Sequence, residues 1–421
     1  MNNENYELQQ RHQASPTEGP SSQISKKGTF SIFKNSEFKT TWRPLVAYWL
    51  LGLCNNYGYV VMLTAANDIL SEESEEPSNN STDNPERECN YMSTGAILLA
   101  DILPSLLIKI TAPFLPFFVN VRVVICILLA ISGFLIVAFS YSQWLSILGV
   151  VATSLASGLG EITFLQYSTN YNKNVVSTWS SGTGGAGIIG AFSYVALQIL
   201  GTRTALLTMT AIPVIMGISF WIILSKPTKL NKKDDGDESD KKVKKLSFKR
   251  KVYFIPKLLK FMIPLGLVYF LEYFINQGMF ELIHFENTFL DKNSQYRWLQ
   301  VDYQLGVFLS RSSVNIIHIR KIWLMAVFQL INVIYFTTEV IFYYTPWFWI
   351  VLVITLWEGL LGGAAYVNTF YRVSTEIPEE ERHFAMGITT FSDSIGIALA
   401  GVLAIVTHNE ICALPKPERL G

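Results

Sequence analysis

The stretch Leu271–Leu282, LEYFINQGMFEL, decides what kind of protein this is. It places the carboxylates Glu272 and Glu281, with an Asn and a Gln between them, inside Phe261–His284, a segment otherwise apolar enough to cross a bilayer. A charged side chain at membrane depth costs several kcal/mol unless it faces a partner or a water-filled cavity, so its presence favours a functional role. Further charges lie in or beside other long apolar segments, at Asp101, Lys109, Glu161, Arg311, Glu358 and Asp393. A membrane protein with this many internal charges is expected to move a polar solute.

The composition agrees with a polytopic membrane protein. Half of the 421 residues are hydrophobic and only 16% are charged. The 33 basic residues balance the 33 acidic ones, so no basic field favours a nucleic-acid partner. Neither His284 nor His318 has further metal-ligand residues near it in the sequence. No set of nucleophile and base and no nucleoside-triphosphate-binding motif is visible. We therefore expect no metal or cofactor and no enzymatic activity, so transport would run on ion or solute gradients.

Apolar runs of about 20 residues predict the membrane spans. Six precede a break in the pattern, at 44–64, 93–111, 122–140, 144–169, 182–200 and 204–224. Five follow it, at 261–284, 298–314, 321–343, 346–370 and 384–407. The fold class predicted is an all-α polytopic membrane protein with about 11 transmembrane helices, with ten or twelve as alternatives.

Charged connections predict the domain organisation and the orientation. The expected parts are a cytosolic tail (1–42), a six-helix bundle (43–224) with a luminal loop (65–92), a cytosolic linker (225–260), a second bundle (261–408) and a tail (409–421). Lys226–Lys260 holds thirteen Lys or Arg residues, whereas residues 65–92 hold one base, Arg87, against eight acids. Positive charge marks the cytosolic side, so the N-terminus is predicted to be cytosolic. Overlapping N-x-S/T sequons at Asn79 and Asn80 predict a glycosylated luminal loop, although chance occurrence is the alternative.

The two halves carry matching features when they are overlaid with an offset of six spans. Leu53–Tyr59 resembles Phe274–Phe280, Gly158–Glu161 resembles Glu358–Gly363, and Lys109 corresponds roughly to Arg311. These matches predict two parallel helix-bundle repeats of the major-facilitator plan, with substrate bound between them and the last span missing from the second.

The glycine-rich stretch Ser180–Gly187 contains a literal G-x-G-x-x-G. A dinucleotide site would need a preceding strand and a soluble βαβ unit, and the surrounding pattern favours neither. Gly182, Ala186 and Gly190 are spaced four apart on one helix face, which instead predicts close packing against a neighbouring helix.

Polar residues inside the spans are the candidates for binding substrate or a coupling proton. Glu161 shares a face with Ser157, and Glu272 shares one with Asn276, while Gln277 and Glu281 lie on an adjacent face. The structural alternative for Glu161 is burial with its hydrogen bonds satisfied by helix hydroxyls, and the alternative for Glu281 is a position at the luminal interface. Arg311 is the natural clamp for a phosphate or carboxylate, but it and Lys109 equally suit topology anchors that snorkel, and we expect Lys109 not to touch substrate. Glu358 is expected to pair with Arg311. The remaining candidates are Tyr366, Asn368, Asp393 and Asp101.

Several blocks closely resemble the battenin family, the lysosomal membrane proteins of juvenile neuronal ceroid lipofuscinosis. The blocks are Leu50–Asn56, Leu98–Pro104, Ser157–Glu161, Trp179–Gly187, Glu272–Gly278 and Glu358–Phe370, and the similarity runs from about Trp42 to Cys412. The resemblance implies a major-facilitator-like protein of late endosomes and lysosomes with a role in clearing glycerophosphodiesters. It also implies effects on lysosomal pH, basic amino acids and vesicle trafficking, and importance for Glu272, Arg311 and Asp393.

The C-terminus departs from that family. Battenins can end in a prenylation box, but here Cys412 is followed by nine residues, so prenylation is not expected. Eleven spans put Cys412 on the luminal side, where it could pair with Cys89, whereas a prenylated tail would be cytosolic. The sequence leaves the two placements open.

The function predicted is a secondary transporter that exports glycerophosphodiesters from the lysosome by alternating access. The partners expected are a small polar or zwitterionic solute and the lipid bilayer. One alternative is a transporter of basic amino acids or protons. Another is a regulator of endolysosomal trafficking that does not transport and recruits proteins through its cytosolic tails.

Overall fold

The computed structural model describes residues 36–72, 87, 94–198, 200–227, 247–290, 292–417 and 419. The chain divides into two units, Met1–Thr41 and Trp42–Gly421, and the helix bundle belongs to the second. Most of the expected tail 1–42, the expected sequons at Asn79 and Asn80, and most of the charged linker lie outside the described residues.

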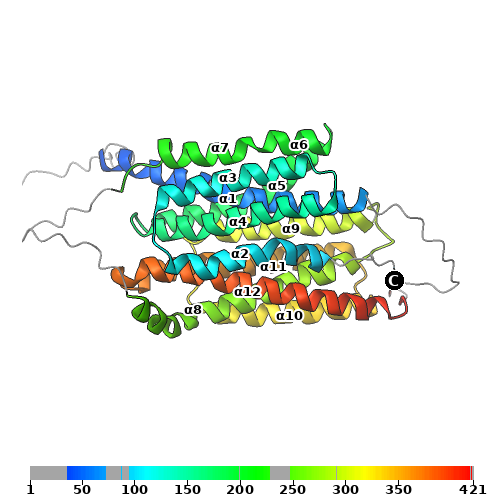
Figure 1. The fold of residues 1–421 in the computed structure, drawn as a ribbon. Coiled ribbons are helices and arrows are strands. Elements are labelled where there is room, and N and C mark those ends of the chain that lie inside the picture. Colours follow the sequence, from blue (N-terminus) through cyan, green and yellow to red (C-terminus); the bar gives the residue numbers. More distant parts are fainter. Residues whose placement is uncertain are drawn as a thin grey trace, which may run out of the picture. The chain divides into compact units, whose positions relative to one another are not determined.

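The elements of the described part are all helical, as predicted (Figure 1). The first half contains α1 (Ser36–Glu72), α2 (Thr94–Thr111), the 3₁₀ turn η1 (Ala112–Phe114), α3 (Val119–Ala138), α4 (Gln143–Ser168), α5 (Asn174–Gln198), α6 (Thr202–Met209), α7 (Ala211–Ile218) and the π-helical η2 (Ser219–Ile223). The second contains α8 (Phe248–Phe274), the π-helical η3 (Ile275–Met279), the 3₁₀ turn η4 (Phe280–Leu282), α9 (Lys292–Ser312), α10 (Ile322–Phe342), α11 (Phe348–Glu376) and α12 (Glu379–Cys412).

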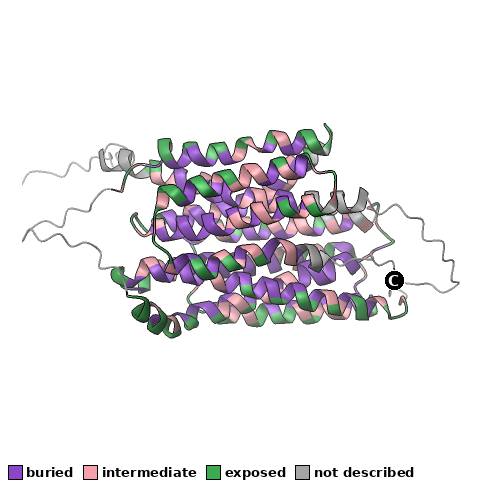
Figure 2. Cartoon of the chain, viewed as in Figure 1, coloured by how far each residue is buried: buried purple, intermediate pink, exposed green. Residues whose placement is uncertain are grey.

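Each predicted span coincides with a helical segment. The sixth is formed by α6, α7 and η2 together, and the seventh by α8 with η3 and η4. By length and composition alone, seven helices of the described part are long and apolar enough to cross a membrane: Val119–Ala138, Trp144–Ser168, Arg203–Ile223, Phe248–Leu282, Ile322–Phe342, Phe348–Glu376 and Glu379–Cys412. Their outward faces are exposed and their inward faces buried, as a lipid-embedded bundle requires (Figure 2).

The helix α8 corrects one predicted boundary. It begins at Phe248, so residues 248–260 are helical rather than part of the expected linker 225–260. Its Lys and Arg residues are good helix formers. Phe254, Leu258 and Phe261 are buried on one face because they are spaced four and three residues apart. Helical periodicity therefore extends into the basic region that charge alone assigned to a linker. At the other end, α12 continues to Cys412, beyond the expected limit of 408.

Matched glycine pairs bring helices together in both halves. In the first half, α1 crosses α5 where Gly52 and Gly182 each face backbone, and a Cβ on either would overlap it. In the second half, α8 crosses α12 where Gly266 and Gly396 do the same. Such close approach is typical of small residues at membrane helix crossings. The repeat predicted from the sequence is therefore built on equivalent crossings.

The glycine-rich stretch of α5 packs on two sides. Gly182 faces the Trp49 carbonyl, a Cβ on Gly190 would lie 3.3 Å from Cγ1 of Val60, and Ala186 is fully buried. This confirms the predicted packing face against α1. Gly184 and Gly187 do not belong to the four-residue series, and they face α9 of the other half. They therefore help to form the seam, the contact surface between the two halves. The halves meet where α5 packs on α9 and α2 packs on α12.

The first loop and the C-terminal segment lie at the same end of the bundle. Arg87 of the loop donates hydrogen bonds to the carbonyls of Val340 (2.6 Å), Ile341 (3.0 Å) and Pro415 (3.3 Å). The first loop follows one span, so a C-terminal segment at the same end requires an odd total number of spans. This agrees with the eleven predicted. Cys412 is disulfide-bonded, Cys54 and Cys126 are free thiols, and Cys89 lies outside the described residues.

Candidate functional site

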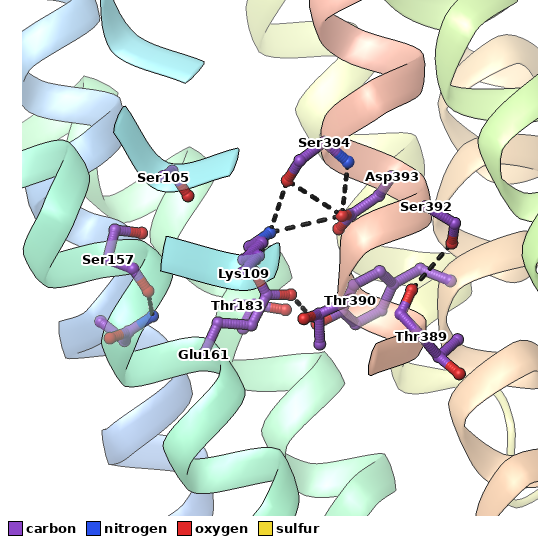
Figure 3. Close-up of polar contacts among 12 residues, drawn as sticks. Ser105, Lys109, Ser157, Glu161, Thr183, Thr389, Thr390, Ser392, Asp393 and Ser394 are labelled. Carbon is purple, nitrogen blue, oxygen red and sulfur yellow. Dashed lines mark hydrogen bonds and ion pairs between the residues drawn. The ribbon is translucent and has the colours of Figure 1, made fainter. Parts of the chain in front are cut away.

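Lys109 of α2 lies at the centre of a polar cluster that joins the two halves (Figure 3). Its Nζ is 2.6 Å from Oε2 of Glu161 on α4 and 3.3 Å from Oδ1 of Asp393 on α12. It also donates a 2.8 Å hydrogen bond to Oγ of Ser394. No side chain of the ionic trio is more than 10% exposed. A buried ion pair is tolerated when good geometry and extra hydrogen bonds offset the loss of hydration, and Lys109 meets both conditions.

Tyr366 of α11 extends the cluster across the seam. Its hydroxyl donates a 2.6 Å hydrogen bond to Oε1 of Glu161, and it accepts one of 3.3 Å from Nε1 of Trp179 on α5. Asp393 is held in turn by the backbone N–H of Ser394, at 2.6 Å. Both carboxylates of the cluster are therefore oriented by uncharged donors as well as by the ammonium group.

Arg311 of α9 is a second cation at the seam. Its guanidinium donates hydrogen bonds of 2.8 Å to Oγ1 of Thr183 and 2.8 Å to the hydroxyl of Tyr269. Its Cζ lies 4.4 Å from the centre of the Tyr366 ring, and its Nε has no hydrogen-bond partner in the described part of the chain. The direct partners of this half-buried cation are hydroxyls and a ring, rather than a carboxylate. It is therefore equipped to accept an anionic group from outside.

Glu272 of α8 lies deeper in the second half and is 1% exposed. One of its oxygens accepts a short hydrogen bond from the Tyr303 hydroxyl. Its carboxylate packs directly against Gly362 of α11, where a Cβ would overlap both oxygens. Gly362 is therefore the residue that makes room for this carboxylate inside the bundle.

Glu358, also on α11, is fully buried, and neither of its carboxylate oxygens has a hydrogen-bond partner within the described ranges. We expected it to pair with Arg311, and this expectation is wrong because the guanidinium is turned toward Thr183 and Tyr269. Asp101 of α2 is buried in the same unpartnered way, and Ser154 bonds its backbone carbonyl instead.

Three other predicted site residues occupy different surroundings. Asn276 and Gln277 are buried in the π-helical η3, where the wider turn breaks the four-residue spacing that we used to place Asn276 on the face of Glu272. Asn368 accepts a 2.7 Å hydrogen bond from the backbone N–H of Ile319 and donates one of 2.9 Å to the Ala364 carbonyl. It therefore fastens the α9–α10 connection, and no hydrogen bond between described residues joins it to the cluster.

Lys109 is the largest correction to the sequence interpretation. We expected a snorkelling anchor, but its side chain is 5% exposed and bridges the halves. The residues that sequence reasoning missed are the uncharged partners Trp179, Thr183, Tyr269, Tyr303 and Ser394. Only Tyr269 and Ser394 could have been found from the sequence, because each lies within one helical turn of a charged residue already identified, Glu272 or Asp393.

This arrangement can bind a solute that carries both charges. The seam offers one cation without a carboxylate partner, two carboxylates that hold an ammonium group, and several hydroxyl groups. Hydrogen bonds and ion pairs across the seam are also contacts that can be exchanged when the halves rock against each other.

Comparison with known proteins identifies relatives along most of the chain. The family model described as CLN3 protein matches residues 46–246 and 229–414. Battenin from Canis lupus familiaris is 42% identical over 408 residues, which cover 89% of this chain and 92% of that protein. Protein BTN1 from Kluyveromyces lactis is 36% identical over 380 residues, covering 87% of this chain and 93% of its own length.

A solved structure supports the fold class. The bacterial homologue of the human lysosomal transporter Spinster, in an inward-facing and occupied conformation, superposes with a TM-score of 0.53. The two share 16% identity, and the match covers 85% of this chain and 79% of that one. At this identity the likeness concerns the fold alone, and it confirms the predicted major-facilitator-like architecture.

Proposed function

The chain belongs to the CLN3 protein family, and on that premise we propose that it is a secondary transporter of lysosomal and late endosomal membranes that exports glycerophosphodiesters. The observation that carries this proposal is Arg311, a seam cation held by two hydroxyl groups and a ring. A guanidinium bonds two phosphate oxygens at once, so the phosphodiester is the part of the cargo that it would bind.

Hydroxyl and carboxylate groups near Arg311 suit the rest of such a molecule. Thr183 and Tyr269 already bond the guanidinium and can turn to the glycerol hydroxyls when phosphate replaces them. Glu161 faces the seam through its bond with Tyr366 and would attract a headgroup amine. Cargo binding would therefore draw on both halves, as alternating access between two bundles requires.

Lys109 would act as the gate of this cycle. Its ion pairs with Glu161 and Asp393 join α2 and α4 to α12. They must rearrange when the seam opens. An amine headgroup that binds Glu161 would compete with Lys109 and help to release the gate, which links cargo binding to the conformational change.

The orientation proposed has the N-terminus in the cytosol and the first loop in the lumen. It is supported by the basic linker and by the acidic first loop. In this orientation the C-terminal segment is luminal, because Arg87 of the first loop bonds to Pro415. Glycosylation of Asn79 and Asn80 remains a prediction for that loop.

Transport by the purified protein tests the proposal. We expect saturable uptake of labelled glycerophosphocholine into proteoliposomes, and Arg311→Lys should reduce it at least tenfold because an ammonium cannot reproduce the bidentate bond. Arg320→Lys, at an exposed position in the connection just before α10, is the matched control and should transport normally. Absence of flux with folded wild-type protein, or equal flux from both variants, would reject this cargo site.

One observation favours a second cargo, a basic amino acid. The seam already holds an ammonium group, that of Lys109, between two carboxylates. The side chain of a free lysine could replace it there. Lysine that competes with glycerophosphocholine, and flux that survives Arg311→Lys, would favour this alternative.

A further inference from the structure

Two buried carboxyl groups of the second half take no part in the gate. Glu358 is 0% exposed and Glu272 is 1% exposed. Both oxygens of Glu358 and Oε2 of Glu272 have no hydrogen-bond partner in the part of the chain that the structure describes. The hydroxyl of Tyr303 on Oε1 of Glu272 is the one side-chain donor to the pair there.

The two groups share one helix face. Glu272 lies against Gly362, and Glu358 precedes Gly362 by four residues, so both carboxyl groups adjoin the same stripe of α11. Glu272 is also the charged group that acts electrostatically on Glu358. Glu272 feels one further charge, that of Arg311. The two acids therefore form a pair that is linked to the proposed cargo cation through Glu272 alone.

The surroundings offer little else to neutralise the pair. Tyr269 and Tyr273 of α8, Tyr303 of α9 and Asp393 of α12 interact electrostatically with one another or with Glu272, and none of them adds positive charge. No titratable group of α5 or α10 in the described residues acts on either carboxyl group. Arg311 is thus one cation beside two acids.

An ionised carboxylate without partners is very costly in an apolar interior, and two neighbouring ones repel each other. Such a pair lowers its energy by holding a proton. A shared or bound proton is therefore the ligand that these two side chains require.

We propose that Glu272 and Glu358 form the coupling-proton site of the transporter, separate from the Lys109 gate. A proton from the acidic side binds a carboxylate oxygen of the pair, forms an O–H bond and removes one negative charge. With the pair protonated, Arg311 is free to bind the phosphodiester. When the proton leaves on the other side, the Glu272 carboxylate attracts Arg311 and displaces the phosphate. Proton and cargo then move in the same direction, which is symport.

This mechanism rests on the proposed function for its cargo, so the test separates the two. Wild-type and Glu358→Gln proteins are compared in two proteoliposome assays with labelled glycerophosphocholine. One measures exchange between cargo on both sides at equal pH, and the other measures accumulation driven by a pH gradient. We expect Glu358→Gln to keep exchange within about twofold and to lose accumulation at least tenfold. Glu376→Gln, at the other end of α11 and paired with Arg372, is the control and should accumulate normally.

Accumulation by Glu358→Gln at the wild-type level would overturn the proton site while leaving the transporter intact. If wild-type protein exchanges no glycerophosphocholine, the cargo proposal fails, and infrared difference spectra between acid and neutral pH still test the pair. A protonated-carboxyl C=O band that disappears in both Glu358→Gln and Glu272→Gln supports the site. A band unchanged in both variants contradicts it.

Discussion

The two halves share their helix crossings and differ in the charges that they bury. Gly52 and Gly182 each face the backbone of the partner helix where α1 crosses α5, and Gly266 and Gly396 do so at the equivalent crossing of α8 and α12. Between the corresponding helix pairs α1–α4 and α8–α11, however, the packing partners differ: Asn55 packs against Gly160 in the first half, and Glu272 packs against Gly362 in the second. The two halves therefore share their backbone plan, but the first buries an uncharged amide between these helices and the second buries a carboxyl group.

This difference divides the work between the halves. The first half supplies Lys109 and Glu161, which neutralise each other at 2.6 Å. The second half supplies Arg311, Glu272 and Glu358, none of which forms an ion pair within the described residues. Oppositely charged groups in contact suit a gate, and charged groups without an ion-pair partner suit the binding of an anion and a proton.

The largest expected effect comes from breaking the gate. Lys109→Met should destabilise the protein by about 3–5 kcal/mol, because it leaves Glu161 and Asp393 buried without their cation. Thermal unfolding in detergent measures the loss. Adding Asp393→Asn should restore part of the stability, and a double variant no more stable than Lys109→Met would show that the charge balance is not the cause.

The shared crossings are tested next. Gly182→Ala and Gly396→Ala should each cost about 1–3 kcal/mol, because the new methyl group meets the backbone of the facing helix in both halves. Size-exclusion profiles and melting temperatures report the damage. Gly185→Ala is the control, since its Cβ would lie 3.5 Å from Cζ2 of Trp49, an ordinary contact. Unequal losses at Gly182 and Gly396 would mean that the crossings are not equivalent.

Two tyrosine–carboxylate hydrogen bonds, one to Glu161 of the first half and one to Glu272 of the second, test whether the halves differ in charge. Tyr366→Phe removes a donor from the ion-paired Glu161 and should cost about 1.5–3 kcal/mol. Tyr303→Phe removes a donor from Glu272, which we propose shares a proton, and should cost about 0.5–1.5 kcal/mol. Chemical or thermal unfolding at neutral pH compares the two. A larger loss for Tyr303→Phe would indicate that Glu272 is ionised in the resting protein.

The smallest effect concerns the surface ion pair of the second half in which Nζ of Lys416 lies 2.9 Å from Oε1 of Glu286. The hydrogen bond and charge of Lys416 lower the pKa of Glu286 below its usual range. The pair therefore adds stability above the ordinary glutamate pKa of about 4.3 and loses it as the pH falls through the lowered value. Glu286→Gln should flatten this part of a melting-temperature profile between about pH 3 and 5, the window around that pKa. An unchanged profile would show that the pair contributes nothing.

The sequence predicted the positions of the helices better than the partners of their side chains. Long apolar runs located every span, and four-residue spacing identified the packing face of Gly182 and Gly190, because these signals are local. Lys109 was misjudged because an end-of-span lysine normally snorkels, and its partner Asp393 lies 284 residues away. The π-helical turn at Ile275–Met279 also left no trace in residue spacing.

The charged linker shows the same limit at a boundary. Composition assigned residues 248–260 to the cytosolic linker, although Phe254, Leu258 and Phe261 carry helical periodicity. Charge density describes which side of a membrane a segment prefers, whereas periodicity describes whether it folds against a neighbour. Where the two signals overlap, the structure followed periodicity.

The anchored C-terminal segment has a practical consequence for imaging and purification. Arg419 bonds to Glu339 at 2.6 Å and to the His284 carbonyl at 2.8 Å, close to where Arg87 holds Pro415. In the proposed orientation and the proposed lysosomal location, a fluorescent protein or affinity tag fused behind this segment would face an acidic, protease-rich lumen and would disturb the contacts of Arg419. Reporters attached ahead of α1 would avoid both problems, so N-terminal fusions are the better choice for following this protein in cells.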